Sequence, residues 1–216
     1  MSIFSRAALV LTIGALSACA AENLSAPPTP IGDFRLGFDT VVADQSQPVG
    51  PSRKATPDEW EAAFKQEIGK RIGRYDGSRI YHIGVGVTAY ALAVPGVPIL
   101  LSPKSVVVFS VDVWDDALQR TVNAEPKEFT VFEGISGATV IGSGLTKSRE
   151  QQIATLSENA ARKIGEWLVE NKAWFTPEAV AARAALPPLP KPATGTVPLA
   201  ATKALPPAGS SAAPTN

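Results

Sequence analysis

The sequence predicts an α+β two-layer sandwich, in which a small, mostly antiparallel sheet is covered by two helices. Apolar residues alternate with polar ones in several short segments, as they do in half-buried strands. In two longer segments they recur every three or four residues, as they do in amphipathic helices. The resulting order of strand, helix, three strands and helix differs from the regular alternation that builds a parallel sheet.

Both helices are predicted from a capping box and an apolar stripe. The first begins after Thr56, where Glu59 completes the box, and it ends before Gly73. The second begins after Ser148, where Gln151 has the same role, and it runs to about residue 171. The expected buried stripes are Trp60, Phe64, Ile68 and Ile72 in the first helix, and Ile153, Leu156, Ala160, Ile164, Trp167 and Leu168 in the second.

Four strands are predicted, at residues 34–42, 80–94, 105–115 and 127–133. Residues 44–55 are a polar loop between the first strand and the first helix. In the second strand, Ile83, Val85, Val87, Ala89 and Ala91 share one face, and His82, Gly84, Gly86, Thr88 and Tyr90 share the other. Two glycines on the same face predict that a neighbouring element approaches the strand closely there.

The chain divides into four parts. Residues 1–18 are a signal peptide, and residues 19–32 are a tether rich in proline and alanine. Residues 33–175 form the sandwich domain. Residues 176–216 are predicted to form a short helix and then a disordered tail, because proline, alanine, threonine and serine dominate its composition.

The segment Leu16-Ser17-Ala18-Cys19 contains the only cysteine of the chain. It closes an apolar run, residues 7–16, that is too short for a membrane span, which needs about 20 residues, and that suits a cleaved secretory signal. The four residues match the lipobox of bacterial lipoproteins, in which the cysteine is lipidated and becomes the first mature residue. The alternative is ordinary secretion, with Cys19 removed or left as an unpaired thiol.

With its lipobox and its order of elements, the chain resembles uncharacterised proteobacterial envelope lipoproteins whose fold is similar to the amino-terminal domain of TolB. The resemblance covers residues 34–172. It implies a protein held to the membrane through lipid on Cys19, with an envelope protein as its partner. Ala20 follows the cysteine instead of an aspartate, which in the usual enterobacterial sorting pattern implies the outer membrane, facing the periplasm.

The composition excludes several classes of protein. Basic and acidic residues are equal in number, 20 each, without a basic tract, so we expect no binding to nucleic acid. A single cysteine allows no disulfide within the chain. The single histidine, His82, cannot form a cage of histidine and cysteine ligands, and so neither a metal nor a cofactor is expected.

The residues that could carry out catalysis are few. A Ser-His-Asp triad could recruit His82 and Asp112, but no Gly-x-Ser-x-Gly elbow is present, and His82 is interpreted as structural or exposed. Asp112, Asp115 and Asp116 form an acidic cluster that could transfer protons or bind a hard cation. The adjacent pair lacks the alternating spacing of a calcium loop, which favours a turn.

A glycine-rich segment superficially resembles a phosphate-binding loop. Residues 137–142 begin and end with glycine, and Lys147-Ser148 follows a few residues later. A phosphate-binding loop needs glycine, lysine and serine or threonine in direct succession, and Ser143 stands in the place of the lysine. The segment is therefore interpreted as a glycine hairpin that leads into the second helix.

An apolar segment, residues 94–101, contains two prolines and a glycine that prevent a regular strand or helix. It is either folded under the domain or presented outward as a contact surface. In the second case, the contacting residues are Val94, Pro95, Val97, Pro98, Ile99, Leu100 and Leu101.

These observations favour a non-enzymatic lipoprotein that acts through contacts of the apolar segment and the tail with other envelope components. A second hypothesis is a small-molecule-binding accessory lipoprotein of a transport system, with a pocket between sheet and helices lined by Tyr90, Trp114 and Trp167. An enzyme would instead need a pocket that joins His82 to the acidic cluster.

Overall fold

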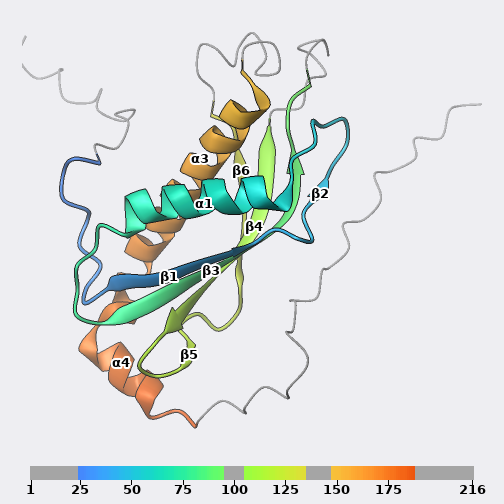
Figure 1. Cartoon of the computed structure of the whole chain (residues 1–216). Coiled ribbons are helices and arrows are strands. Elements are labelled where there is room, and N and C mark those ends of the chain that lie inside the picture. The colour runs from blue at the N-terminus through green and yellow to red at the C-terminus, as the bar shows by residue number, and fades with distance from the viewer. Residues whose placement is uncertain (1–23, 95–104, 135–146, 188–216) are drawn as a thin grey trace, which may run out of the picture.

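The computed structural model describes residues 24–94, 105–134 and 147–187 of the 216-residue chain. It is an α+β sandwich, as predicted, with a twisted sheet as one layer and two helices as the other (Figure 1). These helices, α1 (Pro57–Ile72) and α3 (Arg149–Glu170), pack against each other on the same face of the sheet. We call this face inner and the opposite face outer.

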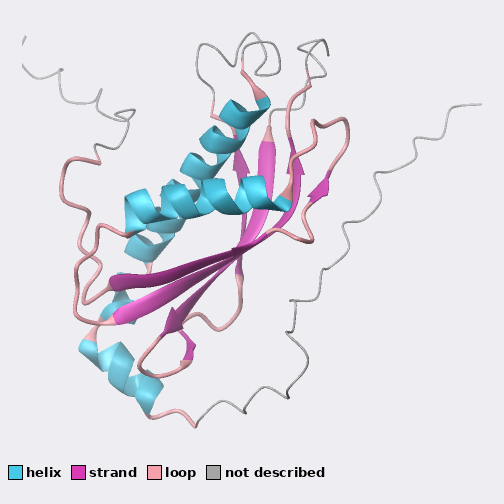
Figure 2. Cartoon of the chain, in the orientation of Figure 1, coloured by secondary structure: helices cyan, strands magenta, loops and turns pink. Residues whose placement is uncertain are grey.

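Six strands form the sheet: β1 (Arg35–Val42), β2 (Gln47–Pro48), β3 (Ile80–Ala91), β4 (Val106–Asp115), β5 (Arg120–Thr121) and β6 (Lys127–Phe132). The central pair, β3 and β4, is antiparallel. On one side, β1 and β2 follow each other along β3 and are parallel to it. On the other side, β6 and β5 follow each other along β4 and are antiparallel to it, so the sheet is only four strands wide (Figure 2).

Both predicted capping boxes are confirmed. The Thr56 hydroxyl accepts a hydrogen bond from the backbone N–H of Glu59, whose carboxylate accepts one from the N–H of Thr56. Ser148 and Gln151 repeat the arrangement at the start of α3. All residues of the two predicted stripes are buried: Trp60, Phe64, Ile68, Ile72, Ile153, Leu156, Ala160, Ile164, Trp167 and Leu168.

The second strand differs from its prediction in two respects. It ends at Ala91 and not at residue 94. Tyr90 was expected on the face of His82, but it is only 2% exposed and packs against Trp60 of α1 at a ring-centroid distance of 5.3 Å. The reason is a β-bulge between Val87 and Ala89, which shifts the alternation of faces by one residue.

The segment that follows α3 closes the end of the sheet where β3 begins. This segment consists of the 3-10 turn η1 (Lys172–Phe175) and the short helix α4 (Pro177–Ala184), which Thr176 caps by accepting the N–H of Ala179. The ring of Phe175 packs edge-on against Phe34 and Tyr81 at centroid distances of 5.1 and 5.0 Å. The predicted short helix after Thr176 is therefore confirmed, and it is joined to the core.

Residues 24–32, which the sequence places in the tether, lie against the domain, and we call them the N-terminal strap. The Tyr75 hydroxyl donates to the carbonyl oxygen of Thr29 at 3.0 Å, and the Arg74 guanidinium donates to that of Ala26. Ile31 is buried in the core. The chain is thus held to the body of the domain from about residue 26 onward.

Asp33 joins the strap to the start of β3. Its carboxylate accepts hydrogen bonds from the hydroxyl and the N–H of Ser78 and from the N–H of Arg79. These bonds, those from Ser78 above all, lower the pKa of Asp33 below its usual value. A carboxylate whose pKa is lower in the folded state stabilises the fold above the unfolded pKa, and this contribution is lost as the pH falls through the folded pKa.

We therefore expect Asp33→Ala to lower the free energy of unfolding at pH 7 by more than it does at about pH 3, because the stabilisation from the lowered pKa decreases once the pH is below the usual pKa of an aspartate. Urea unfolding followed by tryptophan fluorescence at both pH values measures the difference. Asp44→Ala, at an exposed loop position, is the control and should have a small effect at both. An equal loss for Asp33→Ala at both pH values would contradict the proposed role.

Candidate functional site

The outer face of the sheet carries a hollow of about 440 Å³. Its lining includes Thr40, His82, Gly84, Asp112, Trp114, Thr121, Asn123 and Pro126. The expected close approach of a neighbouring element to Gly84 is wrong, because a Cβ built there would lie 4.0 Å from the nearest atom, the Cβ of Asp112. At Gly86 the nearest atom is the hydroxyl of Ser110 on the adjacent strand. The missing side chain of Gly84 opens the hollow between its neighbours.

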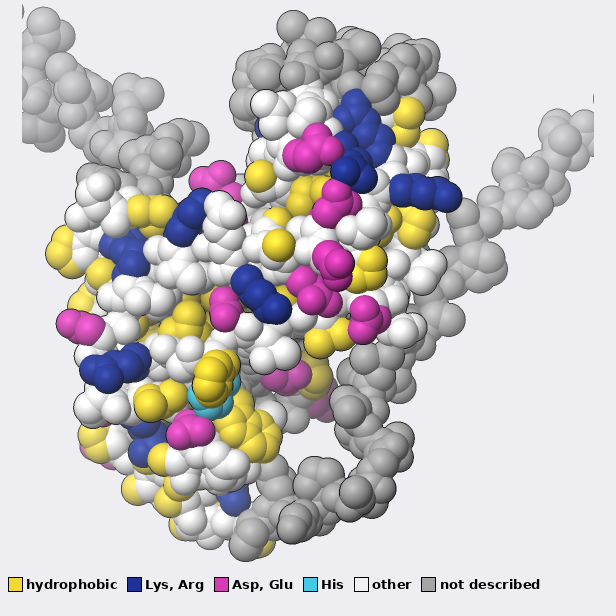
Figure 3. Space-filling model, in the orientation of Figure 1, with side chains coloured by type: hydrophobic (Ala, Val, Ile, Leu, Met, Phe, Trp, Pro, Cys, Tyr) yellow, Lys and Arg dark blue, Asp and Glu magenta, His cyan; other side chains and the backbone are white. Residues whose placement is uncertain are grey.

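His82 borders this hollow with both ring nitrogens engaged. The backbone N–H of Phe38 donates to Nδ1 at 2.8 Å, and Nε2 lies 3.0 Å from a carboxylate oxygen of Asp116. Because Nδ1 accepts, the neutral ring carries its proton on Nε2 and donates it to Asp116. The histidine thus fastens β1 to the turn after β4, which agrees with the structural interpretation. Figure 3 shows it (cyan) among hydrophobic and acidic side chains at the surface.

The contact of His82 with β1 depends on Gly37. The strand is irregular between Leu36 and Asp39, and there the ring of Phe38 stacks over the imidazole at a centroid distance of 5.1 Å. A Cβ at Gly37 would lie 2.6 Å from the side chain of Ile80 and 2.7 Å from the imidazole of His82. Only glycine therefore allows β1 to pass so close to the histidine.

Asp112 and Trp114 are neighbours on the outer face of β4 and line the hollow together. Asp112 is partly buried, and burial raises its pKa, although a hydrogen bond from the Asn123 amide at 3.2 Å opposes this effect. Asn123 is itself fixed, because it accepts the N–H of Val113 and donates to the carbonyl oxygen of Glu125. The arrangement presents a carboxylate beside an indole ring, which is suited to binding a cation.

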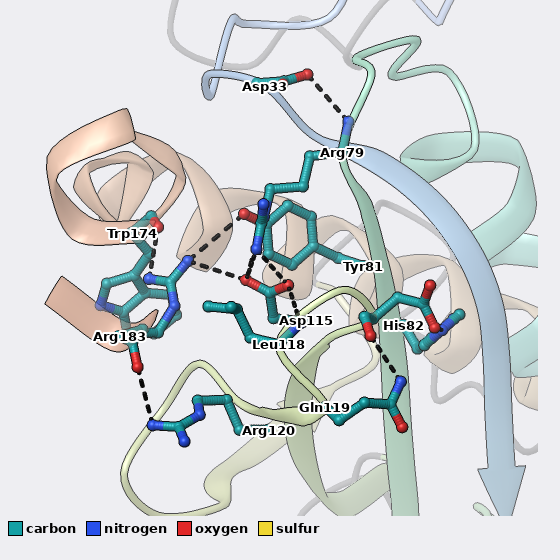
Figure 4. Close-up of polar contacts among 11 residues, drawn as sticks. Asp33, Arg79, Tyr81, His82, Asp115, Leu118, Gln119, Arg120, Trp174 and Arg183 are labelled. Carbon is teal, nitrogen blue, oxygen red and sulfur yellow. Dashed lines mark hydrogen bonds and ion pairs between the residues drawn. The ribbon is translucent and has the colours of Figure 1, made fainter. Parts of the chain in front are cut away.

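Asp115, the next acidic residue of the predicted cluster, faces the inner side and is fully buried. Its two carboxylate oxygens accept hydrogen bonds from the Arg79 guanidinium at 2.7 and 2.8 Å, and one of them lies 3.4 Å from Arg183 of α4 (Figure 4). The N–H of Leu118 donates to Asp115 as well. Burial and the negative charge of Asp115 raise the pKa of Tyr81, the core residue beside this ion cluster.

Arg120, on β5, holds the far end of α4. Its guanidinium donates to the carbonyl oxygens of Arg183, Leu186 and Pro187 at 2.9, 3.3 and 2.7 Å. The sequence did not predict a structural role for the three arginines of this region, Arg79, Arg120 and Arg183. No local motif marks them, since they meet only through the pairing of β3, β4 and β5 and the docking of α4.

The predicted acidic cluster is therefore divided by the sheet. Asp112 faces the outer hollow, Asp115 lies in the inner ion cluster, and Asp116 begins a turn in which its carbonyl oxygen accepts from Gln119. The adjacent pair stands at the start of a turn, with Asp115 as the last residue of β4 and Asp116 as the first residue of the turn. The hollow is lined by both His82 and Asp112, as a pocket joining the histidine to the acidic cluster would be. However, His82 donates its Nε2 proton to Asp116 and not to Asp112.

The three aromatic residues of the hypothetical small-molecule pocket are not brought together. Trp114 lies on the outer face, whereas Tyr90 packs on Trp60 in the core. Trp167 packs edge-on against Phe129 and Trp174 at centroid distances of 5.8 and 5.1 Å. A different hollow, of about 350 Å³, lies where the strap meets α1 and α3, and its lining includes Arg71, Arg74, Tyr75 and Arg162.

Several predicted features lie outside the described residues. These are Cys19, the contact residues 95–101, the glycine segment 137–142 with Ser143, and the tail beyond residue 187. Val94 is the only one of the seven contact residues that is described, and it is partly buried. Ser148, from the phosphate-loop comparison, serves as the cap of α3.

Within residues 24–94, 105–134 and 147–187, the structure shows no group of acidic, histidine or cysteine side chains that could hold a metal ion. Among the helices described, none combines the length and the apolar character that crossing a bilayer requires.

No protein-family model and no curated protein matches the sequence. Among solved structures, the chain is similar to a Xanthomonas campestris protein of the DUF330 family, with 16% identity, a TM-score of 0.38, and coverage of 68% of this chain and 92% of that one. A candidate lipoprotein of Caulobacter crescentus CB15 has 15% identity, a TM-score of 0.35, and coverage of 64% and 93%. A minor lipoprotein of Acinetobacter baumannii has 14% identity, a TM-score of 0.29, and coverage of 62% and 94%.

The two adjacent aspartates should differ strongly in their effect on stability. Asp115→Asn leaves Arg79 and Arg183 without their buried counter-charge, and breaking a buried pair costs about 3 kcal/mol or more. The side chain of Asp116 is 48% exposed, and Asp116→Asn retains a hydrogen-bond acceptor for His82, so it should cost about 1 kcal/mol or less. Urea unfolding of the two variants tests this. If Asp115→Asn lowered the free energy of unfolding as little as Asp116→Asn does, the ion cluster would not support the fold.

Proposed function

We propose that this protein is a lipid-anchored component of the bacterial envelope that acts by binding a partner and not by catalysis. The observation that carries the proposal is the lipobox Leu16-Ser17-Ala18-Cys19, followed within seven residues by a strap that is bound to the domain. The alanine after Cys19 favours the outer membrane, with the domain in the periplasm.

The strap limits how far the domain lies from the bilayer. Arg74 binds the carbonyl oxygen of Ala26, which is seven residues after Cys19. Seven fully extended residues span at most about 25 Å. The segment after α1 that carries Arg74 and Tyr75 is therefore held next to the membrane surface, and the domain has a preferred side toward the bilayer.

Two of the side chains that sequence analysis considered for catalysis have structural partners. His82 is engaged through both ring nitrogens, and Asp115 is neutralised by two arginines. Large apolar side chains are instead exposed on the sheet, with Phe38 at 73% and Phe132 at 57% exposure. These two side chains lie on strands at opposite edges of the sheet and are candidate contact positions for a partner within this proposal.

Removal of the lipidation site is the first test of the proposal. Cys19→Ala should move the full-length chain from the membrane fraction to the soluble fraction of the periplasmic extract, because the acyl chains contribute about 0.8 kcal/mol per buried CH₂ group. Ala21→Ser, a similarly small change two residues later, should leave the chain with the membranes. If Cys19→Ala remained fully membrane-bound, the lipid-anchor proposal would be wrong.

Photo-crosslinking from the apolar segment is the second test. With a photoreactive residue at Ile99 of the anchored chain in living cells, we expect capture of a discrete envelope protein, identified by mass spectrometry. The same residue at Glu158, an exposed position of α3, serves as the control and should not capture that protein. Crosslinks only within the chain would show that residues 94–101 are not the contact surface.

A further inference from the structure

The outer-face hollow presents an indole ring and a carboxylate that have no part in the ion cluster around Asp115. Trp114 presents a partly exposed indole, and Asp112, beside it on β4, has one side-chain hydrogen bond to the described residues, which it accepts from Asn123. Gly84 leaves the floor open, and Pro126 forms part of the rim. An aromatic ring next to a carboxylate suits an apolar segment that carries a positive charge.

A basic, proline-rich segment has this character. Polyproline II is already extended before it binds, so it loses little conformational entropy, and proline rings dock against aromatic side chains in shallow grooves. A lysine or arginine within such a segment can then pair with an acidic residue at the edge of the groove. The hollow supplies both elements, with the ring from Trp114 and the carboxylate from Asp112.

The chain itself contains such a segment, which begins at the last described residue, Pro187. Residues 187–192 are Pro-Pro-Leu-Pro-Lys-Pro, and residues 187–216 contain two lysines and no acidic side chain. The charge of this segment is therefore opposite to that of Asp112. Because the charge complements the hollow and the prolines complement the indole, the tail matches both parts of the site.

The tail leaves the domain close enough to the outer-face hollow to reach it. Arg120 holds the carbonyl oxygens of Leu186 and Pro187, and the next residue on β5, Thr121, pairs with Trp114 and lines the hollow. As polyproline II, the tail advances about 3.1 Å per residue, so Lys191 lies about 12 Å of chain beyond Pro187. β5 is two residues long and lies at the edge of the sheet, so the tail has only this short strand to pass.

We propose that the outer-face hollow binds residues 188–196 of the same chain, with prolines against Trp114 and Lys191 paired with Asp112. The attachment at Pro187 gives the segment an effective concentration in the millimolar range, so an intrinsically weak contact is sufficient. Docking would cover the outer face near Trp114 and direct the remaining tail away from Arg120 along the sheet.

Disulfide trapping tests this proposal in the full-length chain carrying Cys19→Ala, so that no third thiol is present. Thr121→Cys places a thiol at the hollow, and Ala193→Cys places one in the tail. The matched control combines Ala193→Cys with Ala117→Cys, at an exposed turn position that is also close to Arg120 but outside the hollow. Under mild oxidation, we expect the 121–193 disulfide to form about tenfold faster than the 117–193 disulfide.

Three further substitutions separate docking from random collision. Trp114→Ala and Lys191→Glu should each reduce the ratio of the two rates to near one. Gly84→Val should do the same by filling the hollow, at a site where a Cβ meets nothing closer than 4.0 Å, and circular dichroism would confirm that each variant is folded.

Equal rates for the two cysteine pairs, or a ratio that Gly84→Val leaves unchanged, would overturn the proposal. A disulfide that forms only between two copies of the chain would overturn it as well, because the tail would then occupy the hollow of a neighbour. Loss of the lipid anchor does not alter any of these outcomes, so the result is independent of the proposed envelope location.

Discussion

The antiparallel register of β3 and β4 is the constraint on which the rest of the structure depends. It pairs Tyr81 with Asp115 and His82 with Trp114. Because neighbouring residues of a strand point to opposite faces, the first pair lies in the core and the second on the outer surface. A slip of one residue would exchange these sets and place a carboxylate at the surface and an indole in the core. Every other strand pairs with β3 or β4.

The buried carboxylate of Asp115 ties this register to the docking of α4. A buried charge is costly unless it is paired and hydrogen-bonded, and here it is satisfied by Arg79 near the start of β3 and by Arg183 on α4. Three segments distant in sequence must therefore be in place together. An acidic residue that could have suggested catalysis is instead a structural ion partner, and the same closure positions Arg120 at the beginning of the tail.

The two faces of the sheet consequently have different roles. The inner face is covered by α1 and α3, whereas the outer face keeps a hollow beside Trp114 and exposed apolar side chains such as Phe38. The strap is bound to the domain through Arg74, and Pro187, where the tail begins, is bound by Arg120 on β5, next to the hollow. In the proposed function and the proposed docking, attachment to the membrane and contact with the outer face come from opposite ends of the chain.

The sequence by itself determined the class of fold, the order of elements, both capping boxes and the buried stripes of α1 and α3. The strands depend on residues two positions apart, and the capping boxes and helical stripes on residues three or four positions apart, so all of these interactions are local. Only the tertiary structure decided that Tyr90 faces the core, that Asp115 is paired with Arg79 and Arg183, and that Gly84 opens a hollow. Those outcomes depend on a bulge and on pairings such as that of Arg79 with Asp115, 36 residues apart, which no local pattern records.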